Sequence, residues 1–282
     1  MTDTPDRATA AEPASTATSA GTDPVDLAAL LELAVTAARA AGQELLQRYG
    51  HVEGLATKST ATDPVSDADR ASEALLVRML TQQRPADGLL GEEGASRPST
   101  SGITWVVDPL DGTVNYLYQL DNWAVSVAAQ DEAGSVVGVV HDPRRDLTYT
   151  AVRGGGARCN GRPLAVNDPV PLDRALLGTG FGYSAERRRR QATVIGGVLP
   201  RIRDIRRIGS AALDLCAVAA GTLDAFYEEG IQLWDVAAGG LVATEAGAVV
   251  SHLRLTDAPT GYLFAGPALH PDLEAALRAA GS

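Results

Sequence analysis

The first part of the chain carries apolar residues at helical spacing. From Thr22 to Gly50 they fall on one side of a predicted helix, at Leu27, Leu30, Leu31, Ala34 and Ala38. Thr22 or Asp23 is expected to cap this helix, Pro24 suits its first turn, and Gly50 ends it. Residues 66–83 repeat the pattern and predict a second helix.

Short apolar runs separated by turn residues come next. The segments "GLLGEEG" (88–94) and "ITWVVD" (103–108) predict two buried strands. Three further runs between residues 123 and 156 predict successive strands joined by turns, a meander rather than a series of βαβ units.

Helical and strand patterns alternate in the last part of the chain. Residues 206–227 contain a helix closed by Gly221, and residues 233–251 predict a helix, a glycine turn and a strand. Layers of helices and antiparallel strands predict an α+β fold.

Composition narrows the class of protein. The 282 residues are 45% apolar and 21% charged, which is typical of a soluble globular chain of one or two domains. No apolar run is long enough to cross a bilayer. The net charge of -11 argues against nucleic acid as a partner held by bulk electrostatics. An anionic substrate stays possible, because a bound metal ion inverts the local charge.

The cysteines, the histidines and the first residues of the chain predict the compartment. Cys159 and Cys216 lie far apart in sequence and lack zinc-type spacing, and two free thiols suit the reducing cytoplasm. No two of the four histidines have metal-site spacing. Residues 1–21 are rich in Ala, Thr, Ser and Pro and contain acidic residues, so we expect a disordered tail rather than a targeting signal.

The stretch "WVVDPLDGTVNY" (105–116) ends an apolar strand in two aspartates. One interpretation is structural, with Asp111 capping a short helix and Asp108 accepting a turn hydrogen bond. A calcium loop is excluded, because the alternating ligands and final glutamate are missing. The Asp-x-Asp-Gly-Thr motif of aspartyl-nucleophile phosphatases is closer, but an extra residue here should turn the second carboxylate in a different direction.

Two more acidic segments have the same setting. Glu92 follows a predicted strand in "GEEG", and Asp235 opens a predicted helix in "LWDVAAG". Each alone fits a solvated turn or a helix cap. Together with Asp108 and Asp111 they form a set of carboxylates that suits a hard divalent cation, and Mg²⁺ is the natural choice beside a phosphate.

These motifs resemble the inositol monophosphatase family of magnesium-dependent, lithium-sensitive sugar and polyol phosphatases. The resemblance runs from about Leu27 to Leu277 and includes "GEEG", "WVVDPLDGTVNY" and "WDVAAGGLVATEAGAVV". It implies a layered α/β/α/β/α sandwich with mostly antiparallel sheets. It also implies a phosphatase domain over residues 22–282, with halves that meet at about residues 157 and 158, and a homodimer.

The resemblance implies roles for individual residues. The metal ligands would be Glu92, Asp108, the Leu110 carbonyl, Asp111 and Asp235, holding two or three Mg²⁺ ions. The catalytic residues around the attacking water would be Asp69, Thr113 and Glu92. The substrate contacts would be Gly112, Thr113, Gly209, Ser210, Ala211 and Glu228. Lys58 and Asp63 would lie on a mobile loop that closes over the site.

Some positions next to these need their own interpretation. Glu229 is expected to be a solvated neighbour of Glu228. Asp121 stands where family members usually have proline, a departure expected to change only a loop. The arginines at 187–190, 201, 203, 206 and 207 are expected to form a solvated face, with a contact surface as the alternative.

The implied reaction is hydrolysis of a phosphate monoester by direct attack of a metal-activated water, with no covalent intermediate. Asn115 in "DGTVNY" is typical of the inositol phosphatase branch, so a phosphorylated polyol, inositol monophosphate, is the expected substrate. Histidinol phosphate, adenosine 3',5'-bisphosphate and fructose 1,6-bisphosphate stay open as alternatives. So does a non-catalytic regulatory module that keeps the fold.

Overall fold

The computed structural model describes residues 1, 26–51, 56–57, 64–255 and 261–281. The predicted tail at 1–21, apart from Met1, and the predicted loop residues Lys58 and Asp63 lie outside the described residues. Among the helices that the structure describes, none combines the length and the apolar composition that a membrane span requires.

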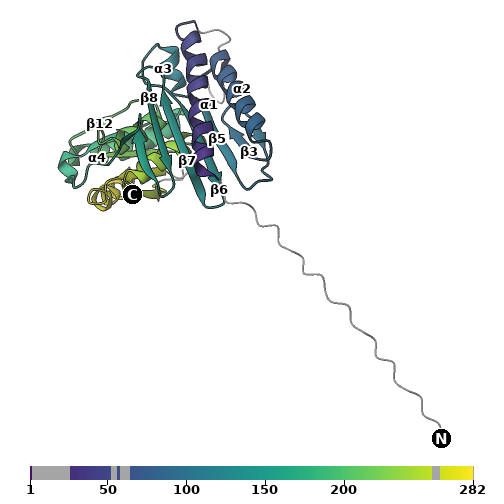
Figure 1. The fold of residues 1–282 in the computed structure, drawn as a ribbon. Helices are drawn as coiled ribbons and strands as arrows, with labels where there is room; N and C mark the ends of the chain where they lie inside the picture. The colour runs from purple at the N-terminus through teal and green to yellow at the C-terminus, as the bar shows by residue number, and fades with distance from the viewer. Residues whose placement is uncertain (2–25, 52–55, 58–63, 256–260, 282) are drawn as a thin grey trace.

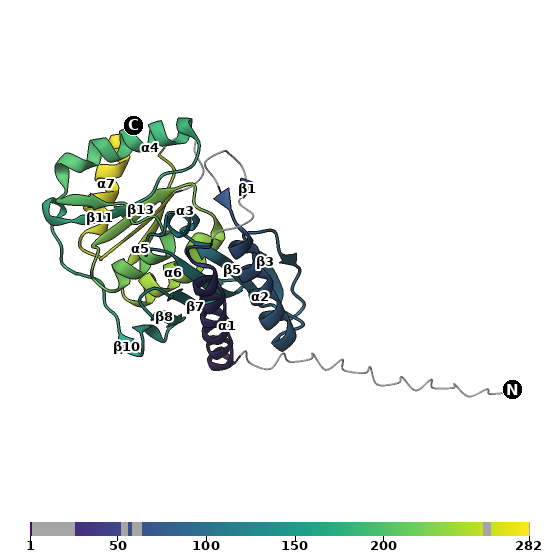
Figure 2. The same cartoon turned by 90° about the horizontal axis from the view of Figure 1, so that it is seen from above.

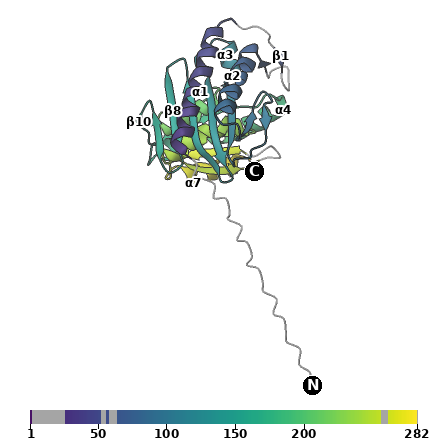
Figure 3. The same ribbon diagram turned by 45° about the vertical axis from the view of Figure 1, so that its right-hand side comes forward.

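The molecule is built of five layers (Figures 1 and 2). The first layer is a helix pair, α1 (Leu27–Arg48) and α2 (Asp67–Gln83), which lie side by side over one face of a large sheet (Figures 1 and 3). The middle layer contains α5 (Ala211–Ala219) and α6 (Leu233–Glu245), between the large sheet and a smaller one. The last layer is α4 (Ala185–Val198) and α7 (His270–Gly281). The expected α/β/α/β/α sandwich is confirmed.

The large sheet has eight strands, and all but one of its strand pairs are antiparallel. Only β3 and β5 run parallel. In sheet order the strands are β10 (Arg162–Pro163), β9 (Gly156–Cys159), β8 (Leu147–Val152), β7 (Gly134–Asp142), β6 (Ala124–Asp131), β5 (Thr104–Asp111), β3 (Gly88–Gly91) and β4 (Ser96–Arg97). The predicted meander corresponds to β6, β7 and β8.

The smaller sheet has five strands and is mixed. Its parallel part is β12 (Asp204–Arg206), β11 (Leu176–Thr179) and β13 (Ala225–Glu229). Its antiparallel part adds β15 (Gly261–Ala265) and β14 (Val249–Leu253). The remaining elements are the pair β1 (Ala56–Thr57) and β2 (Pro64–Val65), the short helix α3 (Thr113–Leu117), and the 3₁₀ turns η1 (Leu172–Arg174) and η2 (Leu199–Arg201).

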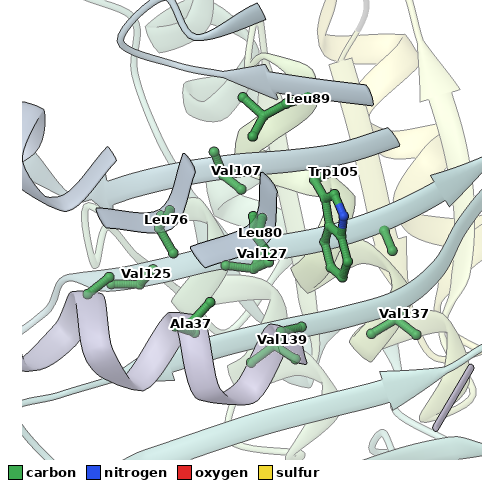
Figure 4. Close-up of a cluster of buried hydrophobic side chains, with 14 of the residues drawn as sticks. Ala37, Leu76, Leu80, Leu89, Trp105, Val107, Val125, Val127, Val137 and Val139 are labelled. Atoms are coloured by element: carbon green, nitrogen blue, oxygen red, sulfur yellow. The ribbon is translucent and has the colours of Figure 1, made fainter. Parts of the chain in front are cut away.

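Strand alternation divides the core into separate clusters between the layers. Trp105 and Val107 of β5 point toward α1 and α2, as Figure 4 shows, whereas Val106 points toward the middle helices. In β13, Phe226 packs in the cluster on the middle-layer side, and Tyr227 in the cluster with α4 and α7. Because both sheets are covered on both faces, their strands are apolar on both sides.

The first helix starts later than the sequence suggested. Its N-cap is Asp26, whose carboxylate accepts hydrogen bonds from the N–H groups of Ala28 and Ala29 at 3.0 and 3.1 Å. The expected caps, Thr22 and Asp23, lie before the helix and outside the described residues.

The proposed boundary between halves, near residues 157 and 158, stays a prediction.

Candidate active site

The two aspartates at the end of β5 point to the same side because the strand contains a bulge. Asp108 pairs with Ser126 of β6 and Asp111 pairs with Ala124, so three steps along β5 match two along β6. In a regular strand, residues two positions apart point to the same face. Because the bulge adds one residue to β5, Asp108 and Asp111 point to the same face although they are three positions apart. The expectation that the extra residue turns the second carboxylate elsewhere is therefore wrong.

Local hydrogen bonds hold the bulge. The Leu110 N–H donates to Asp108 Oδ1 at 2.9 Å, which is the expected turn hydrogen bond. Ser72 Oγ, from α2, donates to the carbonyl of Pro109 at 2.8 Å. Asp108 is only 1% exposed. The bulge is thus fixed by the adjacent helix as well as by the proline, which has no N–H to give to the sheet.

Asp111 does not cap the helix that follows it. Gly112 occupies the N-cap position of α3, whereas Asp111 Oδ2 accepts from Ser210 Oγ at 2.6 Å and from the Ala212 N–H at 2.7 Å. These donors belong to the start of α5, about 100 residues along the chain. Asp111 therefore joins the large sheet to the middle layer.

Asp235 completes a cluster with these two aspartates. It lies in the first turn of α6, and its Oδ2 accepts from the Gln232 N–H at 2.5 Å. One carboxylate oxygen from each of Asp108, Asp111 and Asp235 lies within 4.8 Å of the others. Glu92 follows β3, and its N–H donates to the Val107 carbonyl at 3.3 Å, next to Asp108.

The carboxylates disfavour one another's charge. Burial raises the pKa of Asp108 well above its usual range, and the charges of Glu92, Asp111 and Asp235 raise it further. The pKa of Asp235 is also well above its usual range, through burial and then the charges of Asp111 and Glu92. Burial brings the pKa of Asp111 to about 6 against its hydrogen bonds from Ser210 and Ala212.

Such a cluster fits a hard dication. The donors are all oxygen atoms, the set that Mg²⁺ prefers, and a bound cation removes the repulsion that raises these pKa values. Leu110 and Glu92 line the same cavity. Three of the four carboxylates expected as metal ligands therefore form one cluster, and Glu92 and Leu110 lie in the wall of the cavity that contains it.

Thr113 and Asp69 also meet beside this cluster. The Thr113 hydroxyl lies 3.2 Å from Asp69 Oδ1 and 3.1 Å from the Leu110 carbonyl, and its single proton serves one of them at a time. Asp69 Oδ2 in turn accepts from the backbone N–H and the hydroxyl of Ser66, at 2.9 and 2.6 Å. Asp69 is thus both the capping-box residue of α2 and the partner of Thr113.

Glu73 is a structural support that the sequence analysis missed. It is buried on α2, one turn after Asp69, and accepts from the backbone N–H groups of Glu93 and Ala95 at 2.6 and 2.9 Å. These bonds hold the turn that carries Glu92. The i, i+4 spacing of Asp69 and Glu73 near the start of a helix was the available signal.

Replacing Glu73 with glutamine should lower the free energy of unfolding by about 1–3 kcal/mol. A glutamine side chain has one carbonyl oxygen, so its NH₂ group must face one of the two backbone donors. Urea denaturation measures the loss, and Mg²⁺ binding to the purified chain, measured by calorimetry, should weaken because the Glu92 turn loosens. Glu44→Gln, which removes an exposed ion pair with Arg48, is the control and should cost less than about 0.5 kcal/mol. A Glu73→Gln chain with parental stability contradicts this role.

A cavity of about 420 Å³ extends from the carboxylate cluster to β11 and β13. Its wall includes the expected contact residues Gly112, Thr113, Gly209, Ser210, Ala211 and Glu228. Gly112 has a φ of +94°, and a Cβ there would lie 2.8 Å from the Asn122 carbonyl, so the turn requires glycine. The Asn115 side chain fixes the surrounding loops by donating to the carbonyls of Asn122 and Ile208.

Glu228 also lines this cavity. Burial raises its pKa to about 7, with the Arg207 guanidinium acting in the opposite direction and Asp111 in the same direction. Glu229 is not the solvated neighbour that the sequence suggested. It is 2% exposed, and it raises the pKa of Tyr227, two residues before it on β13. Glu229 is therefore buried, whereas Glu228 is half-buried.

Two of the arginines border the cavity, whereas Asp121 lies in a surface loop. Arg187 and Arg207 line the cavity; Arg207 is exposed, as expected for a solvated face, whereas Arg187 is half-buried. Asp121 lies on the surface and pairs with Arg144 at 2.7 Å, which agrees with a change confined to a loop.

Comparison with known proteins gives consistent matches. The model of the inositol monophosphatase family matches residues 26–281. An inositol-1-monophosphatase SuhB of Mycobacterium tuberculosis is 45% identical over 245 residues, which cover 83% of this chain and 84% of that protein. A Nus factor SuhB of Pasteurella multocida is 40% identical over 224 residues, covering 78% and 84%. The solved structure of the extragenic suppressor protein suhB from Bartonella henselae is similar with a TM-score of 0.82 and 34% identity, over 89% of this chain and 98% of that one.

Proposed function

This chain belongs to the inositol monophosphatase family, and we propose that it is a Mg²⁺-dependent phosphatase that hydrolyses inositol monophosphate. One observation carries the proposal. A single cavity is lined by a cluster of three aspartates within 4.8 Å of one another and by Glu228. The aspartate cluster suits metal ions beside a phosphate, and Glu228 suits the hydroxyl groups of a polyol.

The side chains of Glu92, Asp108, Asp111 and Asp235, with the Leu110 carbonyl, would hold two or three Mg²⁺ ions. When bound, these ions supply positive charge for the phosphate oxygens and lower the pKa of the attacking water. Gly112 and Thr113, at the wall of the cavity, would bind the phosphate.

Thr113, Asp69 and Glu92 would orient the attacking water. Because the Thr113 hydroxyl can donate its proton to Asp69 Oδ1, its oxygen is available to accept a hydrogen bond from the water. Glu92 would accept a second hydrogen bond and fix the direction of attack. The proton of the water can then pass through Thr113 Oγ1 toward Asp69 Oδ1.

The organic part of the substrate would lie against Gly209, Ser210, Ala211 and Glu228. An ionised Glu228 would accept hydrogen bonds from ring hydroxyls, and it would disfavour an ester that lacks them because the bound ester would exclude water and leave the carboxylate without a donor. The pKa of about 7 places this group near half ionisation at neutral pH.

The test is phosphate release by the purified full chain. Chelation of divalent cations should abolish release, and Mg²⁺ should restore it. Inositol 1-phosphate should have the highest kcat/KM in a panel with histidinol phosphate, adenosine 3',5'-bisphosphate and fructose 1,6-bisphosphate, and Li⁺ should inhibit. Absence of release from every ester in the panel at millimolar Mg²⁺ contradicts a phosphatase. Preference for another ester moves the assignment within the family.

A regulatory role is the second candidate, because several relatives at about 40% identity are named Nus factor. The retained set of carboxylates favours catalysis for this chain, and absence of release from the panel would favour the regulatory role. We also propose a cytoplasmic homodimer. The free thiols of Cys159 and Cys216 are consistent with the compartment, and sedimentation of the purified chain tests the dimer.

A further inference from the structure

Asp214 is a buried acid in the cavity wall that the proposed chemistry does not use. It lies in the first turn of α5 and is 1% exposed. Its backbone N–H donates to the Ser210 carbonyl at 3.0 Å, which places it one turn after the residue that binds Asp111. Its Oδ1 has no hydrogen-bond partner among the residues that the structure describes. A buried oxygen left without a donor is unfavourable, and such atoms are rare in folded proteins.

Two glycines make room for this carboxyl and for Glu228. A Cβ at Gly178 of β11 would lie 2.8 Å from Asp214 Oδ1, and a Cβ at Gly180 would overlap the carboxylate of Glu228. Gly178 and Gly180 are two residues apart, so in an extended chain they lie on one face about 7 Å from each other. The two acids therefore lie over the same face of the small sheet, next to β11.

The electrostatics give the two acids different hydrogen-bonding properties. Burial first, and then the charges of Glu228 and Asp111, raise the pKa of Asp214 to about 9 against the effect of Arg207. Asp214 is therefore a neutral acid at pH 7, with one O–H donor and a carbonyl acceptor. Glu228, with its lower pKa, is the better acceptor. A ring hydroxyl is both donor and acceptor, so adjacent hydroxyls match this pair.

We propose that Asp214 is a second specificity-determining residue for the polyol, hydrogen-bonded to a substrate hydroxyl next to the one that Glu228 binds. The inference rests on the proposed function, since it assigns a contact within the same cavity. Asp214 lines the cavity, and a structural role alone does not explain an acid there whose Oδ1 has no partner among the described residues. A hydroxyl of the substrate supplies the missing partner.

The test compares two esters that share a ring and differ in hydroxyl groups, inositol 1-phosphate and cyclohexyl phosphate. The measured quantity is the ratio of their kcat/KM values with Mg²⁺ present. Asp214→Ala should lower this ratio about 10- to 100-fold, because hydroxyl recognition is lost only for the first ester. Asp214→Asn keeps a donor and an acceptor and should hold the ratio within about fivefold of the parent. Asp214→Leu also removes both polar groups, but it is close in shape to asparagine and fills the space that alanine would leave empty. It should lower the ratio as alanine does.

Cys216→Ala is the matched control, because Cys216 is buried on the same helix but packs against the large sheet. It should leave the ratio unchanged. If Asp214→Ala or Asp214→Leu lowers kcat/KM equally for both esters, or leaves both unaltered, the inference is overturned while the phosphatase assignment stands. A parent chain that hydrolyses neither ester overturns the proposed function, and with it the inference.

Discussion

An Asp108→Asn variant is expected to lose at least about a thousandfold in kcat for phosphate release while keeping its fold. A thousandfold corresponds to about 4 kcal/mol of transition-state stabilisation, which is in the range that a bound metal ion supplies. Asp108 is the most buried of the three clustered aspartates, and the substitution removes one carboxylate from the proposed metal site. The amide is nearly isosteric, so the turn hydrogen bond from Leu110 is retained.

The same substitution should not destabilise the metal-free protein. The pKa of Asp108 is raised by burial and by its acidic neighbours, so its ionised form is unfavourable in the folded chain. A neutral asparagine removes that penalty, and Tm measured with a chelator should equal or exceed the parental value. A variant that loses activity because it is unfolded would instead show a lower Tm, and these two measurements separate the explanations.

Asp131→Asn is the control for this experiment. Asp131 ends β6, next to the strand of Asp108, but is exposed and pairs with Arg153. Its replacement should change kcat less than about twofold, because Asp131 does not line the cavity. The loss of its exposed ion pair should lower the free energy of unfolding by only about 0–1 kcal/mol. An Asp108→Asn variant with the parental kcat and the parental Mg²⁺ requirement contradicts the proposed metal site.

The predictable part of the site is the part encoded in local patterns. An apolar run that ends in Asp108, and a helix that starts near Asp235, can be recognised in short windows of sequence. The direction of Asp111 is different, because it depends on the register between β5 and β6. Its hydrogen bonds from Ser210 and Ala212 depend on the packing of a helix about 100 residues away. Neither dependence appears in local spacing.

The sequence analysis misplaced one buried acid, Glu229, and omitted another, Asp214. Adjacent glutamates are usually solvated, but Glu229 belongs to a strand with layers on both sides and is buried. Asp214 lies in the helix "AALDLCAVA", which is otherwise apolar on all sides. A single acid in such a helix was a usable signal of a buried group with a special environment. The lesson is that burial has to be inferred from the layer, before the chemistry of the side chain is considered.

The middle helix α6 is held to the large sheet at short range. Ser135 Oγ of β7 donates to the Ala237 carbonyl at 2.8 Å, and Ser126 Oγ of β6 donates to the Trp234 carbonyl at 3.3 Å. Between these contacts Gly138 of β7 faces Ala238, where a Cβ would lie 2.7 Å from the Ala238 carbonyl oxygen and 3.1 Å from its Cα. The position of Asp235, at the start of this helix, therefore depends on an absent side chain in the sheet.

Gly138→Ala should lower the free energy of unfolding by about 3 kcal/mol, the upper part of the usual range for overpacking, because the opposing atoms are backbone and no rotamer change relieves the contact. Urea denaturation measures this loss. The variant should also need about tenfold more Mg²⁺ for half-maximal phosphate release, because α6 must move away from the sheet and take Asp235 with it.

Gly196→Ala is the matched control for the same change of residue. Gly196 lies on α4 in the outer layer, and a Cβ there would have no atom within 4 Å. Alanine is the better helix former, so this variant should gain about 0.5–1 kcal/mol and keep the parental Mg²⁺ requirement. If the free energy of unfolding falls in Gly138→Ala and rises in Gly196→Ala, the loss in the first variant comes from the interface of β7 with α6. A Gly138→Ala chain with the parental Mg²⁺ requirement would mean that α6 accommodates the methyl group without moving Asp235. The stability of this interface would then be independent of the geometry of the proposed metal site.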